Sequence, residues 1–392
     1  AVPPRQDAAG LLTSVREVAR RATLDESATC VSQGLKVVAR CRQERPDMRL
    51  EHAATSLKEL GLCVLPADKE GGFAVLRQEL FCSKASEAVL SVFKPHRNVS
   101  LRRVKSRAKK LCEQLNLLSV VKKIESSDYD SLQMFFSAKT HKVECPFRVI
   151  VSESGTWQKC VADILQVSLK RLDVDDPFAA RDSAVLIDYL RSCDNNSLTA
   201  FSVDLFYSLP RDGLLSCVEA VIDEYGAVDF QNDCGVSASG FLELLSCYLT
   251  STFVTFDKSI YLQKQGVCIG SCIAPILSEL FLARCDKALF ERLDDLKILK
   301  VFRYVDDFLI LLDTSVFIDP FDSSHSEEFI ALGDPIVSRI LASFHACFKP
   351  LTFTTELPEQ NSIRFLDLRF FFKDHACWVY EPRANKPPLP YS

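Results

Sequence analysis

The sequence has no apolar run that approaches the roughly 20 residues needed to cross a bilayer. It also lacks CxxC pairs and Cys/His sets at zinc-ligand spacing, although it contains 16 cysteines. Many of these, such as Cys63, Cys160 and Cys247, lie on apolar faces, as small hydrophobic thiols do in a reducing, intracellular compartment. The chain starts AVPP, with neither an initiator methionine nor a signal peptide, and we expect a fragment or an internal translation product.

Composition and charge describe a soluble globular protein with an uneven charge distribution. The 392 residues are 47% hydrophobic and 25% charged, which suits two or three subdomains. The net charge of −5 argues against a nucleic-acid partner. However, the segment 94–123 holds ten cations, and its only acidic residue is Glu113. Its cations are Lys94, Arg97, Arg102, Arg103, Lys105, Arg107, Lys109, Lys110, Lys122 and Lys123. A local basic face of this kind suits a phosphate backbone, and a solvated helix face is the alternative.

Hydrophobic periodicity predicts a succession of helices and strands. Spacings of three and four residues predict helices within 1–61 and over 100–118, 157–169, 178–192, 236–250 and 276–292, with another starting at Pro210. Alternation and short runs of β-branched or aromatic residues predict strands over 63–65, 73–76, 147–151, 201–204, 253–256, 260–262, 353–356, 363–372 and 377–380.

The most informative stretch is KVFRYVDDFLILLD, residues 300–313. Its apolar residues predict two buried strands, or one bent strand, around Asp306 and Asp307. Adjacent carboxylates repel each other and raise each other's pKa unless cations bind there. Hard carboxylate oxygens can hold Mg²⁺ against a phosphate, so the pair predicts a divalent-metal site. The alternative is a hairpin turn with both side chains in solvent.

Four further features could bind phosphate or metal. Lys69 stands at a turn, and Arg148 offers a bidentate fork on a predicted strand. Asp204 lies at the end of another strand. The loop 263–275 carries two glycines four residues apart and runs into a helix, so its backbone amides can approach a ligand.

Seven stretches occur in an order that resembles the reverse transcriptases of Penelope-like retroelements. They are LPADKEGG (65–72), AKTHKVECPFRVIVS (138–152), VDLFYSLP (203–210), QGVCIGSCIAP (265–275), FRYVDDFLIL (302–311), FTTE (353–356) and FLDL (365–368). The resemblance implies a right-hand polymerase of α+β class, with an antiparallel palm sheet and packed helices. It implies a helical N-terminal extension over 1–61, fingers over 62–172, a palm over 173–380 and a truncated linker over 381–392. The thumb and the GIY-YIG endonuclease of many members are expected to be absent.

The same resemblance implies a catalytic centre and its partners. Asp204, Asp306 and Asp307 would hold two Mg²⁺ ions, or Mn²⁺, for nucleotidyl transfer from a dNTP to a primer 3′-hydroxyl. The partners would be an RNA template, a DNA primer and dNTPs, with no membrane, and we expect a nuclear place of action. The implied contacts are Lys69 and Arg148 on the triphosphate, Gln265, Gly266 and Gly270 in the nucleotide pocket, Phe206 against the sugar 2′ position, Tyr304 and Val305 beneath the primer end, and Phe365 and Leu366 as primer grip.

One departure from the family pattern concerns the strand of Asp204. The family places the sugar-screening aromatic five residues, and a proline nine residues, beyond the catalytic aspartate. Here Phe206 is two residues and Pro210 six residues beyond Asp204. We favour Asp204 as the metal ligand with three residues lost after it, because FSVD is the expected entry to the strand. In the alternative, Asp204 matches a later acidic position and the catalytic aspartate is missing. The shortened strand, with the missing thumb and start, also predicts a second possible function: a decayed or repurposed copy that only binds nucleic acid.

The glycine loop departs less. The family loop has a QGxPMGSPxSP pattern, and here Cys268, Ile269, Cys272 and Ala274 replace several of its residues while Gly270, Ser271 and Pro275 are kept. We interpret these changes as conservative drift. An RNA-dependent RNA polymerase would share the palm acids and metals, but Phe206 at the sugar-screening position argues against ribonucleotides.

Overall fold

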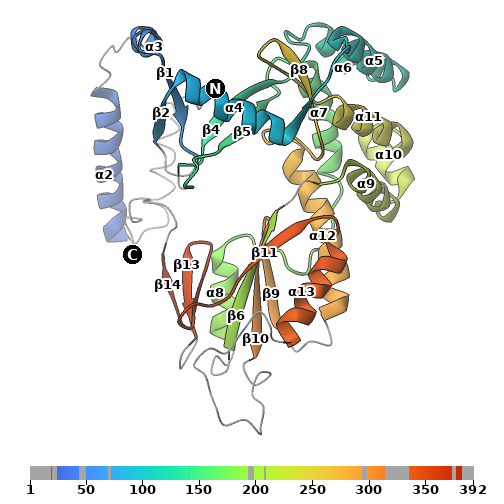
Figure 1. The fold of residues 1–392 in the computed structure, drawn as a ribbon. Helices are drawn as coiled ribbons and strands as arrows, with labels where there is room; N and C mark the ends of the chain where they lie inside the picture. The colour runs from blue at the N-terminus through green and yellow to red at the C-terminus, as the bar shows by residue number, and fades with distance from the viewer. Residues whose placement is uncertain are drawn as a thin grey trace. The chain divides into compact units, whose positions relative to one another are not determined.

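The computed structural model describes residues 19, 24–43, 50–68, 72–140, 142–192, 198–206, 209–293, 298–313, 335–372 and 377–381, with the side chains of 24–26, 37–43, 50–54 and 204–206 excepted. The chain forms two compact units, Ala1–Val64 with Val75–Glu79, and Leu65–Ala74 with Leu80–Ser392. The first unit contains helices α2 (Leu24–Gln43) and α3 (Leu50–Glu59), so the helical prediction is confirmed for these residues of 1–61 (Figure 1). Strands β1 (Leu62–Pro66) and β2 (Phe73–Arg77) pair in a two-stranded sheet, as predicted.

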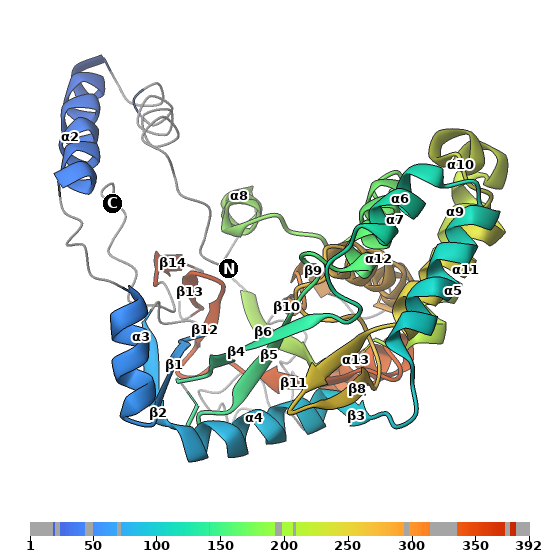
Figure 2. The ribbon, with the colours of Figure 1, turned by 90° about the horizontal axis from the view of Figure 1, so that it is seen from above.

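The next segment mixes helices with two small antiparallel sheets. Its elements are α4 (Gln78–Val92), β3 (Phe93–Pro95), α5 (Leu101–Gln114), α6 (Leu118–Glu125), β4 (Gln133–Ala138) and β5 (Phe147–Ser152). Strands β4 and β5 pair with each other, and β3 joins β7 (Phe253–Phe256) and β8 (Ser259–Gln263) in a second sheet (Figure 2). The helix predicted over 100–118 is confirmed over Leu101–Gln114, but it ends earlier than predicted, because Asn116 adopts a left-handed φ of 58° before α6 begins.

Helices α7 (Trp157–Leu169) and α8 (Ser183–Ser192) follow, and α8 is shorter than the predicted 178–192. Its first turn is capped by Asp182, which accepts a hydrogen bond from the amide of Ala184. Residues 178–180 are not helical and bond to strand β9 instead: Arg303 N donates to Phe178 O at 2.6 Å, and Ala180 N donates to Arg303 O at 2.8 Å. The backbone groups that a longer helix would use internally are thus spent on the sheet.

The central sheet has the antiparallel order β11 (Thr352–Glu356), β6 (Leu198–Phe206), β10 (Asp307–Asp313) and β9 (Ile298–Tyr304). Helices α9 (Arg211–Tyr225), α12 (Ala274–Leu293) and α13 (Pro335–Cys347) share a core with Phe308 and Ile310. Figure 1 shows α12 and α13 beside the sheet. On the other face, Leu309 and Leu311 pack with α8 and with β12 (Ser362–Phe365) and β13 (Leu368–Phe371). Strand β10 is thus covered on both faces, which explains its continuous apolar run.

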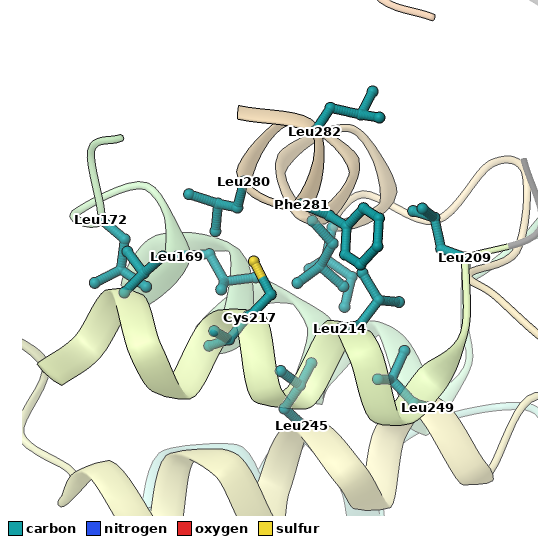
Figure 3. Packing of buried hydrophobic residues seen from close by; sticks show 14 of the residues in the cluster. Leu169, Leu172, Leu209, Leu214, Cys217, Leu245, Leu249, Leu280, Phe281 and Leu282 are labelled. Carbon is teal, nitrogen blue, oxygen red and sulfur yellow. The ribbon is translucent and has the colours of Figure 1, made fainter. Parts of the chain in front are cut away.

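A helical core adjoins the sheet. It is formed by α7, α9, α10 (Ala227–Cys234), α11 (Ala238–Thr250) and α12. Figure 3 shows Leu214 and Cys217 of α9 between leucines of α11 and Phe281 of α12. Buried thiols such as Cys112, Cys217 and Cys285 pack there as small hydrophobic groups, and burial raises the pKa of Cys112 and of Cys285 to about 12.

The C-terminal strands differ in one respect from the prediction. The strand predicted over 363–372 is a hairpin of β12 and β13, because Leu366 has a φ of +56° and turns the chain. Strand β14 (Cys377–Tyr380) pairs with β13, as the sequence predicted a last strand there. None of the helices in the described ranges is long and apolar enough to cross a membrane.

Candidate active site

The acidic pair lies at the turn between β9 and β10. Tyr304 and Asp307 are register partners, so Val305 and Asp306 form a two-residue turn, and the prediction of two strands is confirmed over one bent strand. Val305 has a φ of +59°, a left-handed conformation that a β-branched residue rarely adopts and that costs on the order of 1–3 kcal/mol. Tyr304 and Val305 expose their side chains, whereas Asp306 and Asp307 are half-buried. The turn is therefore not a fully solvated one.

Asp204 adjoins this turn through the sheet. In the antiparallel pairing of β6 with β10, Asp204 is the Cα partner of Asp307. Such partners have Cα atoms about 4.5–5.5 Å apart, so the backbones of three acidic residues meet at one end of the sheet. Among the described side chains no group of three His, Cys, Asp or Glu residues could hold a metal, and the side chain of Asp204 is outside that description. Hard carboxylate donors of this kind suit Mg²⁺.

Arg303 ties the turn to the protein interior. It precedes Tyr304 in β9, and its side chain is only 5% exposed. Its Nε donates to Asp286 Oδ2 of α12 at 2.5 Å, and its Nη2 pairs with Asp176. Its Nη1 donates to the carbonyl oxygen of Val305 at 2.8 Å, inside the strained turn. One guanidinium thus joins two buried acids and the turn that carries Asp306.

The three charges around Arg303 do not balance if both acids are ionised. Asp286 is fully buried, and burial raises the pKa of its carboxyl group to about 8, although the Arg303 guanidinium opposes the shift. The ion pairs with Asp286 and Asp176 raise the pKa of Arg303 despite its burial, so Arg303 stays charged. With both acids ionised the cluster would carry one excess negative charge, and the raised pKa of Asp286 favours its protonated form.

The glycine loop is fastened to strand β5. Gly270 has a φ of +103°, and a Cβ there would lie 2.1 Å from the carbonyl oxygen of Val151. The amide of Val151 in turn donates to the carbonyl of Ile269 at 2.8 Å. Gly270 is therefore required both by its backbone conformation and by the closeness of β5.

A buried polar network fixes the end of the same loop. The carboxylate of Glu153 accepts hydrogen bonds from the Tyr248 hydroxyl and, at 3.3 Å, from the amide of Cys272. The Tyr248 hydroxyl also lies 2.7 Å from Ser271 Oγ. Burial and the neighbouring Glu153 carboxylate raise the pKa of Tyr248 well above its usual value. The hydroxyl therefore keeps its proton and connects Glu153 with Ser271 of the glycine loop.

The start of the loop is held by the residues after β6. Arg211 Nη2 of α9 donates to the carbonyl of Gln263 at 2.5 Å. The side chain of Gln263 bonds to Gln265 O at 2.8 Å and accepts from the Cys268 thiol at 2.7 Å. A Cβ at Gly266 would lie 3.6 Å from the backbone of Leu209. The predicted pocket residues Gln265, Gly266 and Gly270 thus belong to one fixed loop.

Of the predicted triphosphate contacts, Arg148 is described and Lys69 lies outside the described residues. Arg148 is on the less buried face of β5, as predicted, and its Nη1 pairs with Asp68 Oδ1 at 2.9 Å. Ser137 Oγ also donates to this Asp68 oxygen, at 3.3 Å. Strand β5 therefore carries Arg148 and, through Val151, also holds the glycine loop in place.

The remaining predicted residues are placed unevenly. Phe206 is the last residue of β6. Its side chain, like that of Asp204, lies outside the part of the chain that the structure describes. Phe365 is buried and Leu366 is half-buried at the β12–β13 turn. Their role as primer grip stays a prediction.

Our reading of the motifs alone missed the residues that support the site. Arg303, Asp286, Asp176, Glu153 and Tyr248 were not singled out. A signal for Arg303 was available, because a charged residue inside an otherwise apolar, buried strand requires a partner. No comparable signal identifies Asp286 or Glu153, which resemble ordinary solvent-facing acids within their helix and loop.

No protein-family model and no curated protein matches the chain. Among solved structures, it is similar to telomerase from Candida albicans in complex with a TWJ fragment of telomeric RNA, with 14% identity and a TM-score of 0.55 over 93% of this chain and 60% of that one. It is also similar to apo telomerase from Candida tropicalis truncated from its C-terminal domain, with 11% identity and a TM-score of 0.51 over 81% and 63%. The chain spans about three fifths of the telomerase chains that it matches. The chain has the reverse-transcriptase-like polymerase fold, a mixed α/β arrangement with small antiparallel sheets.

Proposed function

We propose that the chain is an RNA-directed DNA polymerase, which transfers a nucleotide from a dNTP to a primer 3′-hydroxyl under the direction of an RNA template. The observation that carries the proposal is the register of β6 and β10, which makes Asp204 the partner of Asp307 beside the Asp306 turn. The polymerase-like fold supports it, because this end of the sheet then has three acidic positions close together.

In this proposal Asp204, Asp306 and Asp307 hold two Mg²⁺ ions, or Mn²⁺. Bound there, the ions would lower the pKa of the primer hydroxyl and neutralise charge on the triphosphate. The chain's own contribution is to fix the acids: the hairpin sets Asp306 and Asp307 side by side, and the ladder sets Asp204 opposite. The half-burial of the two described carboxylates keeps competing water away from part of their surface.

The nucleotide would lie against the glycine loop and the face of β5 that carries Arg148. Arg148 keeps one edge of its fork on Asp68 and has a side chain about one third exposed, so its remaining donors can face a phosphate. Lys69 would grip the triphosphate from the preceding loop, and Phe206 would screen the sugar 2′ position. Loop residues 265–270 would line the base and sugar through their backbone.

The basic helix α5 suits a nucleic-acid backbone. One of its cationic stripes is neutralised within the protein, since Lys105 pairs with Asp130 and Lys109 pairs with Glu125. The second stripe, Arg103, Arg107 and Lys110, is exposed and forms no salt bridge with any residue in the described ranges. These three residues span about 10 Å along the helix, at 1.5 Å per residue, which matches two or three phosphates.

The order and sequence of the motifs favour a Penelope-like retroelement as the source of this polymerase, and an enzyme of a mobile element would act in the nucleus. The test of the whole proposal is primer extension on an RNA template with Mg²⁺, comparing the chain with Asp306→Ala. Loss of one metal-holding carboxylate should lower the rate by several orders of magnitude. Equal extension by the two proteins would contradict the assignment.

A second candidate function is nucleic-acid binding without catalysis. The observation that favours it is the shortened segment after Asp204, where Phe206 and Pro210 come three residues early. This candidate predicts binding of an RNA–DNA hybrid with a steep salt dependence and no incorporation of any nucleotide. Incorporation of NTPs in preference to dNTPs would point instead to an RNA-dependent RNA polymerase and would contradict the screening role of Phe206.

A further inference from the structure

The turn that carries the acidic pair has an unfavourable backbone. Val305 is β-branched and sits at a φ of +59°, where its Cβ crowds the backbone. Its side chain is 55% exposed, so packing around the side chain contributes little to holding this conformation. A backbone of this kind persists only where the surrounding structure holds it.

Arg303 provides such a hold through three separate donors. Nη1 binds the carbonyl oxygen of Val305 at 2.8 Å, while Nε and Nη2 bind Asp286 of α12 and Asp176. The backbone of Arg303 is itself fixed by Phe178 and Ala180. The planar, branched guanidinium can serve all three acceptors at once, whereas a lysine ammonium is a single point on a flexible chain.

We infer that Arg303 is a positioning residue: it holds Val305 in its left-handed conformation and thereby sets the direction of Asp306 and Asp307. The inference rests on the proposed function for its consequence in catalysis, but the hold itself is a property of the apo chain. Asp286 and Asp176 act as the anchor, since they connect the guanidinium to helix α12 and to the segment before α8.

The first experiment measures hydrogen exchange by mass spectrometry in the full chain, on peptides covering residues 300–313. We expect Arg303→Lys to speed exchange at the turn by about tenfold or more, because the turn opens locally once its hold is lost. Arg284→Lys is the matched control. Arg284 of α12 also forms a salt bridge, with Glu224, but this pair is exposed to solvent and lies outside the cluster around Arg303. Unchanged exchange at the turn in Arg303→Lys would overturn the inference.

The second experiment separates positioning from stability by a double-mutant cycle. Glycine accepts a positive φ without a Cβ penalty, so the turn in Val305→Gly should depend less on Arg303. We expect Arg303→Lys to reduce primer extension and speed turn exchange by a smaller factor in the Val305→Gly background than in the wild type. Equal factors in both backgrounds would show that Arg303 acts only through general stability and would overturn the inference.

A third variant covers the case in which a buried acid left without its arginine prevents folding. Arg303→Gln combined with Asp286→Asn removes the positive charge and one acid together and keeps polar partners in the cluster. Faster turn exchange with a normal unfolding midpoint is the expected result, and protection equal to the wild type would overturn the inference. If the wild type extends no primer, the proposed polymerase activity fails, while the exchange measurements still decide the role of Arg303.

Discussion

Gly270 of the glycine loop meets Val151 of β5 so closely that a Cβ on Gly270 would lie 2.1 Å from the Val151 carbonyl oxygen. The contact joins the predicted nucleotide loop to the strand that carries Arg148, and it involves backbone on both sides. Neither partner can therefore yield by a simple change of rotamer. The loop position depends on the absence of a single methyl group.

Gly270→Ala should displace the loop from β5 and lower primer extension by on the order of 100-fold, since a shift of about 1 Å in a positioning element can cost that much. Gly235→Ala is the control, because Gly235 also has a positive φ, +70°, but no atom lies within 4 Å of its Cβ position. The control should lose about 1–2 kcal/mol of stability and keep its activity. Primer extension and thermal unfolding of both variants measure the difference, and equal activity in the two would contradict the collision.

Stability should fall as pH rises because of Asp286. Burial raises the pKa of its carboxyl group to about 8 in the folded chain, from an unfolded value near 4. The folded state then holds a proton that the unfolded state releases between about pH 4 and pH 8. In this window the free energy of unfolding falls with pH, by at most about 1.4 kcal/mol per pH unit for one proton. Below the unfolded pKa the contribution is fully present.

Asp286→Asn should remove this dependence, which urea unfolding midpoints at pH 5 and pH 8 can measure. Asp188→Asn is the control, because Asp188 is a largely exposed carboxylate on α8. The wild type and the control should both lose midpoint between the two pH values, and Asp286→Asn should lose less. A parallel loss in all three proteins would show that Asp286 releases its proton as easily folded as unfolded.

The unpaired stripe on α5 should contribute directly to the salt dependence of nucleic-acid binding. Replacing Arg103, Arg107 and Lys110 by glutamine should make the negative slope of log K against log salt shallower by about 2–3, since each phosphate contact contributes about 0.7–0.9 to its magnitude. The control replaces Lys170, Arg171 and Lys287, which are exposed cations on other surfaces, by glutamine. Fluorescence anisotropy with an RNA–DNA hybrid measures both slopes. An equal change in the two triple variants would indicate that only net charge matters.

The segment after Asp204 can be tested by insertion. Three strand-forming residues, Val-Thr-Val, placed between Asp204 and Leu205 should raise dNTP incorporation if a contracted loop is the fault. The same insertion at the β7–β8 turn, between Asp257 and Lys258, leaves the site untouched and is the control. Primer extension compares the variants with the wild type. No gain from the first insertion would favour the view that Asp204 is not the catalytic aspartate.

Much of the fold could be predicted because local patterns carry it. Helix α7 was predicted with its observed ends, and the hairpin of β9 and β10 follows from an apolar run interrupted by two acids. Where a prediction was wrong, a single backbone conformation decided: Asn116 divides α5 from α6, and Leu366 turns β12 back as β13. Left-handed residues other than glycine leave little trace in hydrophobic periodicity.

The sequence by itself determined the order of the motifs, the apolar faces and the adjacent pair Asp306 and Asp307, because these depend on neighbours within a few residues. Only the tertiary structure decided that Asp204 lies opposite Asp307, and that Arg303 binds Asp176 and Asp286 from distant segments. The register of β6 with β10 and the pair of Arg303 with Asp176 arise from contacts over 100 residues apart along the chain, and Asp286 lies on a different element from Arg303. Burial rather than local preference selects these partners.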